Sequence, residues 1–528
     1  MSMRRAVGHY IGRQVDLGEV PVLETFRSIA RFPIHPLLFA LHAVVSFYAS
    51  NIQQLSFSEA LRSLITVLIV AALSFAALAR ILKNPAKAAS IISIGILLFF
   101  SYNLYSLYSA QLVLITVLVN WLVYFVVKSK KNWDSATVFF NIAACVALAF
   151  PLWVVARNVI ETRSQGELIV SENPTVEITE GVERPNIYYI VLDGYGRADV
   201  LEELYQYPAE KFMDLLRNEG FYIADKSRSN YIRTIFSLAS TFNMDTLEEF
   251  VASNNLENSH DEKWVMLFNY QNRFVKILQK LGYSTIGLNA TYLGSNRTGM
   301  QYFEIPSVGR LNQFELKLLG QTPVHEFLMD IQMQNAFDTH RAKQIEALNR
   351  ISHIAQDYQS PAFVFAHILL PHPPFVFNAD GNPIDPADPN FHIGDADSLV
   401  NITMTIQEYQ KSYGNQIHYL NQMVLEMVKR IRKSDPGAVI VLQGDHGPGS
   451  QYVGNSLAKT NMHERSGILN AYLFPDADYS SLYPAITPAN TFRVISNRFF
   501  KTEFDLVEDT TYFSSTDAAY DFVPVSFE

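Results

Sequence analysis

The sequence predicts a chain of two parts: a membrane domain of five transmembrane helices, and an α/β domain whose largely parallel central sheet lies between helices. Three observations predict this fold class. Five apolar stretches occur before residue 160, short apolar runs alternate with helical patterns after residue 185, and the net charge changes sign between the two parts. We place the membrane domain at residues 1–155, a linker at 156–184 and the α/β domain at 185–528.

The five apolar stretches are each close to the ~20 residues that a helix needs to cross ~30 Å of hydrocarbon. Ionisable side chains are almost absent from them. That absence argues against the alternative, a buried helical bundle of a soluble protein, because five such segments in a row are unusual there. The stretches are Pro33–Asn51, Leu64–Ala79, Ala88–Leu107, Ala110–Val127 and Ala136–Val155.

The loops between these stretches alternate in charge. Lys and Arg precede the first stretch, are absent from Asn51–Ala60, return with Arg80 to Lys87, are absent from Tyr102–Ala110, and return with Lys128 to Lys131. This alternation predicts that the N-terminus is in the cytoplasm. Because five is odd, we expect a multi-pass protein of the cytoplasmic (inner) membrane with residues 156–528 in the periplasm or outside the cell.

The charge of the two parts restricts the partners. Residues 1–159 hold 13 Lys and Arg against 5 Asp and Glu, whereas the rest hold 28 against 46. An acidic soluble part argues against nucleic acid as a partner, because a phosphate backbone needs a basic face. The single cysteine, Cys145, excludes an internal disulfide and a cysteine-based metal cluster.

The candidate strands of the second part are continuous apolar runs with helical patterns between them, such as Pro208–Glu219 and Ile402–Arg432. Continuous runs are typical of strands that are buried on both faces, and the alternation with helices predicts a parallel sheet. The strands are Asn186–Leu192, Ser284–Leu288, Ala362–His367, Ala438–Leu442 and Ile468–Phe474.

Polar side chains follow three of these runs. Asp193 follows the first run, His367 and His372 belong to the third run and its continuation, and Asp445 and His446 follow the fourth. In such sheets the ligand site lies beyond the carboxyl ends of the strands. Carboxylates and an imidazole that converge there predict a divalent-metal site with oxygen and nitrogen ligands.

Four segments carry a family resemblance: NIYYIVLDGYG, SNYIRTIFSLAS, PHPPF and VIVLQGDHGPG, in this order. With them the sequence resembles the alkaline phosphatase superfamily, and within it the sulfatase-like membrane transferases, namely lipoteichoic acid synthase and the phosphoethanolamine transferases. The resemblance implies an alkaline-phosphatase-like (sulfatase-like) catalytic domain outside the cytoplasm, preceded by five spans.

The resemblance implies Thr234 as the nucleophile. Thr234 would also be a metal ligand, together with Asp193, Asp445 and His446. The cofactor would be one divalent ion, Zn²⁺ or Mn²⁺, with a second ion left open. The structural alternative for Thr234 is a helix N-cap, and Ser237 is a weaker candidate for the nucleophile.

The resemblance implies substrate contacts from His372, Arg297 and His463. Ser295 stands where lipoteichoic acid synthases have a Trp before Asn-Arg, and Asp193 stands where those enzymes use Glu. His367, on a buried strand, is interpreted as a core histidine or as a group that supports the metal ligands.

A conventional sulfatase would need a Cys or Ser in a C/S-x-P-x-R motif, which this chain lacks at the site. A Thr alkoxide suits in-line attack on phosphorus. We therefore expect a metal-dependent, membrane-bound phospho-group transferase that takes a membrane lipid-linked phosphodiester and modifies an envelope lipid or glycan acceptor. The alternatives are a phosphodiesterase, phosphatase or sulfatase-like hydrolase with the same site, and an inactive membrane scaffold.

Overall fold

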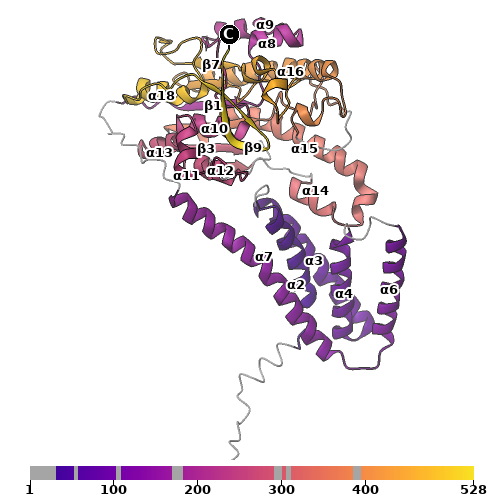
Figure 1. Cartoon of the computed structure of the whole chain (residues 1–528). Helices are drawn as coiled ribbons and strands as arrows, with labels where there is room; N and C mark the ends of the chain where they lie inside the picture. The colour runs from indigo at the N-terminus through magenta and orange to yellow at the C-terminus, as the bar shows by residue number, and fades with distance from the viewer. Residues whose placement is uncertain are drawn as a thin grey trace, which may run out of the picture. The chain divides into compact units, whose positions relative to one another are not determined.

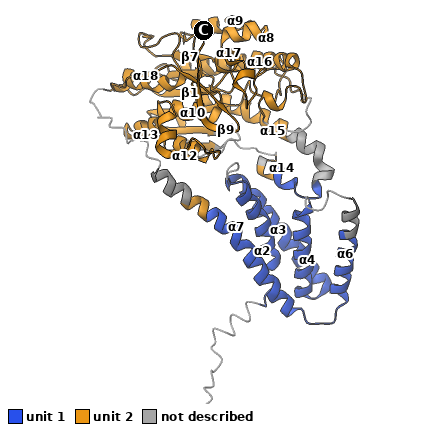
Figure 2. Ribbon diagram, in the orientation of Figure 1, with its two compact units in different colours: residues 1–52, 57–156, 317–327 blue, residues 53–56, 157–316, 328–528 orange. Residues whose placement is uncertain are grey.

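The computed structural model describes residues 31–52, 57–102, 109–168, 182–289, 300–304, 311–358, 360–384 and 394–527. The chain divides into two compact units, which are coloured separately in Figure 2. The first comprises residues 1–52, 57–156 and 317–327, and the second comprises residues 53–56, 157–316 and 328–528.

The first unit is helical, and each predicted apolar stretch falls on one of its helices (Figure 1). Asn84 begins one of them by accepting a hydrogen bond from the backbone N–H of Lys87 at 3.1 Å, and Pro85 follows as its first residue, a position where no backbone donor is needed. The helices are α2 (His35–Ser50), α3 (Phe57–Leu82), α4 (Pro85–Phe100), α6 (Ser109–Lys128) and α7 (Asp134–Leu168).

Two of these helices are long and apolar enough to cross a membrane: α3, and α7 over residues Asp134–Ile160. The helices α2, α4 and Ile115–Lys128 are apolar but shorter. A 16-residue helix such as α2 or α4 is about 24 Å long, which is less than the hydrocarbon thickness. The described residues therefore contain two spans of full length, where the sequence predicted five.

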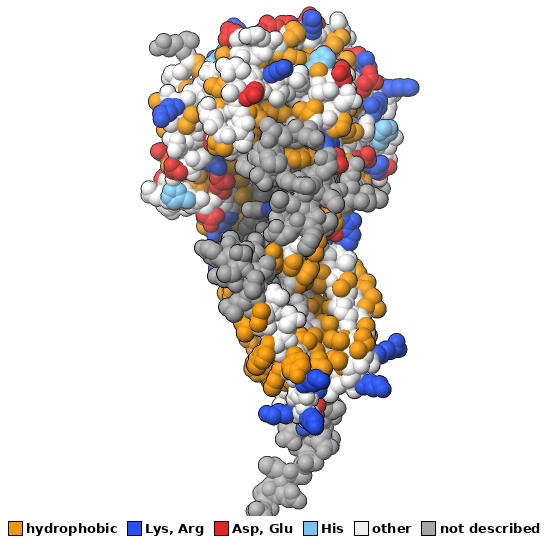
Figure 3. All heavy atoms as spheres, turned by 90° about the vertical axis from the view of Figure 1, so that its right-hand side faces the viewer, with side chains coloured by type: hydrophobic (Ala, Val, Ile, Leu, Met, Phe, Trp, Pro, Cys, Tyr) orange, Lys and Arg blue, Asp and Glu red, His pale blue; other side chains and the backbone are white. Residues whose placement is uncertain are grey.

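Large apolar side chains point outward all along this unit. Leu73 and Ile81 of α3 are 66% and 75% exposed, and Val146 and Phe150 of α7 are 67% and 68% exposed. Apolar side chains accordingly cover much of the visible face of the helices in Figure 3. An exposed apolar surface of this kind is typical of a site that contacts a membrane or another protein.

Helix α7 continues 13 residues past Val155, where the sequence analysis ended the membrane domain. Residues 156–168, assigned to the linker, are therefore helical, and residues 169–181 of that linker lie outside the described part of the chain.

The second unit is built on a seven-stranded sheet of order β2-β7-β6-β1-β5-β3-β4. Strands β6, β1, β5, β3 and β4 pair in parallel, whereas β7 is antiparallel to both of its neighbours. The sheet is therefore mixed rather than wholly parallel. The strands are β1 (Ile187–Leu192), β2 (Tyr222–Ile223), β3 (Ser284–Asn289), β4 (Gln301–Glu304), β5 (Ala362–Ile368), β6 (Val439–Gln443) and β7 (Asn470–Leu473).

Both faces of the sheet are covered, because successive side chains of a strand point to opposite faces. Tyr188 and Ile190 of β1 pack in a cluster with α8 (Ala198–Tyr205), α9 (Glu210–Asn218), α15 (Val324–Ile354) and α16 (Ile406–Ser434). Tyr189 and Val191 pack in another with α10 (Thr234–Asn243), α13 (Arg273–Lys280) and α18 (Pro488–Phe500). Burial on both faces explains why β1 reads as a continuous apolar run.

All five predicted strands occur, with ends that differ by up to two residues. Strands β2 and β4 were not predicted, because they have only two and four residues and give no pattern of their own. A C-terminal hairpin of β8 (Thr511–Ser515) and β9 (Ala518–Val525) was not predicted either. The remaining helices are α11 (Glu248–Asn254), α12 (Lys263–Tyr270), α14 (Gln313–Leu319) and α17 (Met462–Ser466).

Candidate active site

Two buried carboxylates meet beyond the ends of β1 and β6. Oδ1 of Asp445 accepts a hydrogen bond from the backbone N–H of Gly194 at 3.0 Å, and Oδ2 of Asp193 lies 3.0 Å from Nε2 of His367. Each carboxylate has one oxygen left, Oδ1 of Asp193 and Oδ2 of Asp445, and these oxygens are buried without a hydrogen-bond partner in the described structure. Gly194, directly after Asp193, has φ +69°, a conformation that favours glycine, and this turn brings its N–H to Asp445.

An imidazole nitrogen faces the same two carboxylates. Nδ1 of His446 lies 2.8 Å from the carbonyl oxygen of Gly447 and donates its hydrogen there. Nε2, the other ring nitrogen, lies 3.6 Å from Oδ1 of Asp193 and 3.5 Å from Oδ2 of Asp445, and in the neutral tautomer it offers a lone pair there.

The donor set of Asp193, Asp445 and His446 fits a divalent cation. One ligand atom from each residue lies within 4.8 Å of the other two, and all three side chains are buried. Unpartnered buried carboxylate oxygens are costly unless a cation neutralises them. Three oxygen and nitrogen ligands of this kind could hold a divalent cation and leave a coordination position open.

Thr234 is the first residue of α10, and its side chain faces this cluster. Its Oγ1 lies 3.3 Å from Nε2 of His446. The N-cap of α10 is Arg233, whose side chain makes no capping hydrogen bond, so Thr234 does not have the capping role that was the structural alternative. Unlike the three buried ligands, Thr234 is half-buried, and the free N–H groups of a helix N-terminus favour an anion beside it.

Ser237 has a structural task one turn further along α10. Its hydroxyl is buried and donates to the backbone carbonyl of Asp445 at 2.6 Å. This bond fastens α10 to the loop that carries Asp445 and His446, so the hydroxyl of Ser237 is engaged rather than available for attack.

His367 and His372 both lie close to Asp193. Burial raises the pKa of the Asp193 carboxyl, whereas the nearby His372 and His367 lower it. The histidines have the larger combined effect, so the net pKa is below its ordinary value. Burial lowers the pKa of His367 and Asp193 raises it, with a net increase. The ring of His372 is half-buried, 6.2 Å from that of His446, and its backbone N–H donates to the Asp193 carbonyl at 3.1 Å.

Of the other two predicted substrate contacts, only His463 belongs to the described residues, and it is not brought to this cluster. Arg297 lies outside the described residues. His463, on α17, has its Nε2 3.4 Å from Glu203 and 3.9 Å from Asp199, both carboxylates of α8. The half-exposed ring of His463 is thus engaged at the surface of α8.

Arg465 and Asp395 form an ion pair that the sequence did not predict. Arg465 is 2% exposed and pairs with Asp395 at 2.5 Å. Burial lowers the pKa of the Arg465 guanidinium, but Asp395 raises it, and the net pKa is above its ordinary value. The sequence signal that could have found this pair is the position of Arg465 just before the apolar run of β7, two residues after His463. An arginine that is buried at such a position requires an acidic partner.

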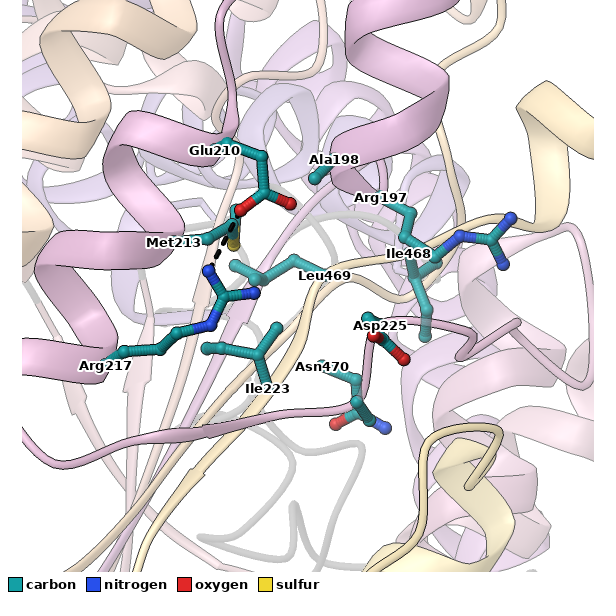
Figure 4. Close-up of a pocket in the computed structure, with 11 residues that line it drawn as sticks. Arg197, Ala198, Glu210, Met213, Arg217, Ile223, Asp225, Ile468, Leu469 and Asn470 are labelled. Carbon is teal, nitrogen blue, oxygen red and sulfur yellow. Dashed lines mark hydrogen bonds and ion pairs between the residues drawn. The ribbon is translucent and has the colours of Figure 1, made fainter.

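A small pocket of about 10 Å³ lies between α8, α9, β2 and the residues around the start of β7 (Figure 4). A space of this size holds about one water molecule. Glu210 and Arg217 form an ion pair at its edge with an N–O distance of 2.9 Å. None of the candidate ligands lines this pocket, so it is separate from the metal-ligand cluster.

Comparison with known proteins gives one family. The sulfatase family model matches residues 185–485, which contain β1 to β7 and every residue of the cluster. No match was found among curated proteins.

Several solved structures are similar to the chain. The C-terminal periplasmic domain of EptC from Escherichia coli, in complex with zinc, has 12% identity and a TM-score of 0.40, covering 66% of this chain and 94% of that one. The integral membrane lipooligosaccharide phosphoethanolamine transferase A from Neisseria meningitidis has 12% identity and a TM-score of 0.39, covering 89% and 95%. A phosphonate monoester hydrolase of Agrobacterium radiobacter has 11% identity and a TM-score of 0.39, covering 62% and 80%.

Proposed function

The chain belongs to the sulfatase family of the alkaline phosphatase superfamily, and we propose that it is a metal-dependent, membrane-bound phospho-group transferase. Its donor is a lipid-linked phosphodiester, and its nucleophile is Thr234. The observation that carries this proposal is the 3.3 Å separation between Thr234 Oγ1 and His446 Nε2, beside two buried carboxylate oxygens without partners. Membership of the sulfatase family supports a transferase or a hydrolase. A threonine nucleophile favours attack on phosphorus.

The proposed cofactor is one divalent cation, zinc or manganese, held by Asp193, Asp445, His446 and Thr234. When bound, it lowers the pKa of a coordinated hydroxyl and neutralises negative charge that develops in the transition state. A threonine hydroxyl is otherwise a weak nucleophile at neutral pH. The N-terminus of α10 adds backbone N–H groups that favour a phosphate beside Thr234.

The reaction then proceeds in two displacements at Thr234. Its Oγ1 bonds to phosphorus as the bond from phosphorus to the lipid alcohol breaks, and the alcohol leaves with a proton. The oxygen of the acceptor hydroxyl next bonds to the same phosphorus as the bond from phosphorus to Thr234 Oγ1 breaks, and the acceptor's proton restores the Thr234 hydroxyl. His372, half-buried beside Gly194 and His446, is the proposed contact for the phosphate oxygens, while the roles of Arg297 and His463 remain predictions.

The helical unit supports a membrane location for the substrate. Helices α3 and α7 can span a bilayer, and their large apolar side chains are exposed. Five spans remain our proposal, with α2, α4 and α6 as the shorter ones. A site on the same chain as these helices would meet a lipid donor at the membrane surface, and the acceptor would be an envelope lipid or glycan.

Basic residues support an orientation. Lys87, just after the α3–α4 loop, donates its Nζ to the carbonyls of Val127 at 3.1 Å and Ser129 at 2.6 Å, so the α3–α4 and α6–α7 loops lie together. Both loops are basic, which favours the cytoplasmic side. The proposed location is therefore the cytoplasmic membrane, with residues 156–528 in the periplasm or outside the cell.

The test is phosphodiester turnover by the full-length protein in detergent, with a phosphatidylethanolamine carrying a radiolabelled headgroup phosphate. We expect metal-dependent release of diacylglycerol and a labelled covalent adduct on Thr234, located by peptide mass spectrometry. Labelled product attached to an added glycan or lipid supports transfer, and labelled product in water alone supports hydrolysis. Turnover that survives metal removal, or that leaves no adduct under rapid quench, would contradict the proposal.

A further inference from the structure

We propose that Arg465 is a positioning residue that fixes Thr234 relative to His446. This inference rests on the proposed function, because both residues belong to that reaction. Nε of Arg465 donates to the carbonyl of Ile232 at 2.9 Å, and its Nη1 lies 3.4 Å from the carbonyl of Gly447. One guanidinium therefore holds the segment that leads into Thr234 and the segment that follows His446.

The carbonyl of Gly447 has two partners. It accepts the Nδ1–H of His446 at 2.8 Å, the bond that turns Nε2 toward the carboxylates, and it is also the acceptor for Arg465. The backbone N–H of Gly447 donates in turn to the carbonyl of Arg465 at 2.7 Å. Arg465 therefore determines where this carbonyl lies, and the carbonyl determines the orientation of the imidazole.

The guanidinium is itself held in place. Its Nη2 is 2.5 Å from Oδ2 of Asp395, and its Cζ lies 4.2 Å from the ring centre of Tyr452. Arg465 is 2% exposed, so the plane of the guanidinium is set by the protein alone. A planar fork with donors in fixed directions can serve three acceptors in this arrangement, whereas a lysine ammonium acts as a point charge.

A second buried arginine provides a matched control. Arg493 of α18 is 8% exposed and, like Arg465, binds two carbonyls and one aspartate. It donates to the backbone carbonyls of Met244 and Asp505, each at 2.5 Å. It also donates to the carboxylate of Asp245 at 3.0 Å. Met244 follows the C-terminal end of α10, about 15 Å from Thr234 along the helix. Arg493 thus has the same kind of structural task without contacting either segment of the site.

The experiment compares Arg465→Lys with Arg493→Lys in the full-length protein in detergent. The first readout is Mn²⁺ affinity, measured by titration with electron paramagnetic resonance. The others are the melting temperature, and kcat and KM for the phosphodiester. For Arg465→Lys we expect Mn²⁺ to bind about 10- to 100-fold more weakly and kcat to fall about 100-fold, with KM within about 3-fold. For Arg493→Lys we expect a lower melting temperature with wild-type Mn²⁺ affinity and kcat.

Equal behaviour of the two lysine variants in Mn²⁺ affinity and kcat would overturn the inference, because Arg465 would then only stabilise the fold. If Arg465→Lys does not fold, Asp395→Asn replaces it, since the amide keeps the shape and removes the charge that orients the guanidinium. That variant should weaken Mn²⁺ binding and kcat in the same direction, and wild-type values for both would overturn the inference. Failure of the proposed function is separate: Thr234→Ala would then turn over substrate normally while the Mn²⁺ titrations remain readable.

Discussion

Thr234 Oγ1 and His446 Nε2 lie 3.3 Å apart, although 212 positions separate the two residues in the chain. The contact joins the start of α10 to the loop after β6. It is fastened one turn further on by the bond from Ser237 to the carbonyl of Asp445. The hydroxyl of Thr234 is thereby held beside the atoms that would bind a cation, and the predictions below depend on that arrangement.

Replacing Thr234 by Ala should retain the fold and the metal but lower kcat by several orders of magnitude, because the attacking oxygen is removed. Thr234→Ser should retain part of the activity, since the oxygen is preserved. Phosphodiester turnover and bound metal, measured on the same samples, check this. Wild-type turnover by Thr234→Ala would mean that a water molecule is the nucleophile.

Replacing Asp445 or His446 by Ala should remove both the bound metal and the activity, since each change removes one of the three buried side chains proposed as ligands. The helical unit should still insert, because neither residue belongs to it. Elemental analysis of purified protein and carbonate extraction of membranes provide the two measurements. Retention of stoichiometric metal by either variant would place the ion elsewhere.

Gly447→Ala should destabilise the second unit by about 2–3 kcal/mol, because overpacking that displaces backbone is costly. A Cβ at this position would lie 2.0 Å from the carbonyl oxygen of Glu464 and 2.7 Å from that of Gly467. Gly437→Ala is the control, because a Cβ there has no atom within 4 Å, and it should change stability by less than about 0.5 kcal/mol. Chemical unfolding followed by circular dichroism distinguishes them, and equal stability of the two variants would contradict the packing described here.

The carboxylate of Asp395 should make stability depend on acid. Burial raises its pKa, but Arg465 lowers it, and the net pKa is about 2, below the ordinary value of 3.8. A carboxyl whose pKa is lower in the folded state stabilises the fold above pH 3.8 and loses that contribution as the pH falls toward 2. Between pH 4 and pH 2 the wild type should therefore lose about 2 kcal/mol more unfolding free energy than Asp395→Asn. Parallel pH profiles for the two proteins would show that the pair contributes nothing.

The proposed topology predicts where reporters fused to the chain are active. Alkaline phosphatase fused after Gln165 should be active, since it requires an oxidising compartment, and a green fluorescent reporter there should be dark if exported unfolded. A fusion after Lys131, in the basic α6–α7 loop, should give the opposite pair of signals. Cytoplasmic activity of the fusion after Gln165 would refute the orientation.

The family and the residues to examine could be predicted from the sequence, because they are recorded in local patterns. Asp193 directly follows an apolar run that is buried on both faces, and Asp445 and His446 directly follow another. In a sheet the carboxyl ends of parallel strands meet at one edge, so adjacency to a strand end is enough to bring such residues together. The match to the sulfatase family confirms the superfamily that these motifs indicated.

Other features of the site have no local signal. The reversed direction of β7 depends on its pairing with β6 and β2, and β2 is only two residues long. The length of each apolar helix also has no local signal. Apolar stretches of about 20 residues fold here into helices as short as 16 residues.

The sequence by itself determined the order of apolar and polar segments, and hence the two-part fold and the chemistry available at the strand ends. Only the tertiary structure decided which atoms face one another. It turned Nε2 of His446 toward two carboxylates through a carbonyl at Gly447. It also joined Arg465 to Ile232 across 233 positions, and engaged His463 with α8. Hydrophobic patterning depends on each residue's neighbours along the chain, whereas these contacts depend on how distant segments close around one core.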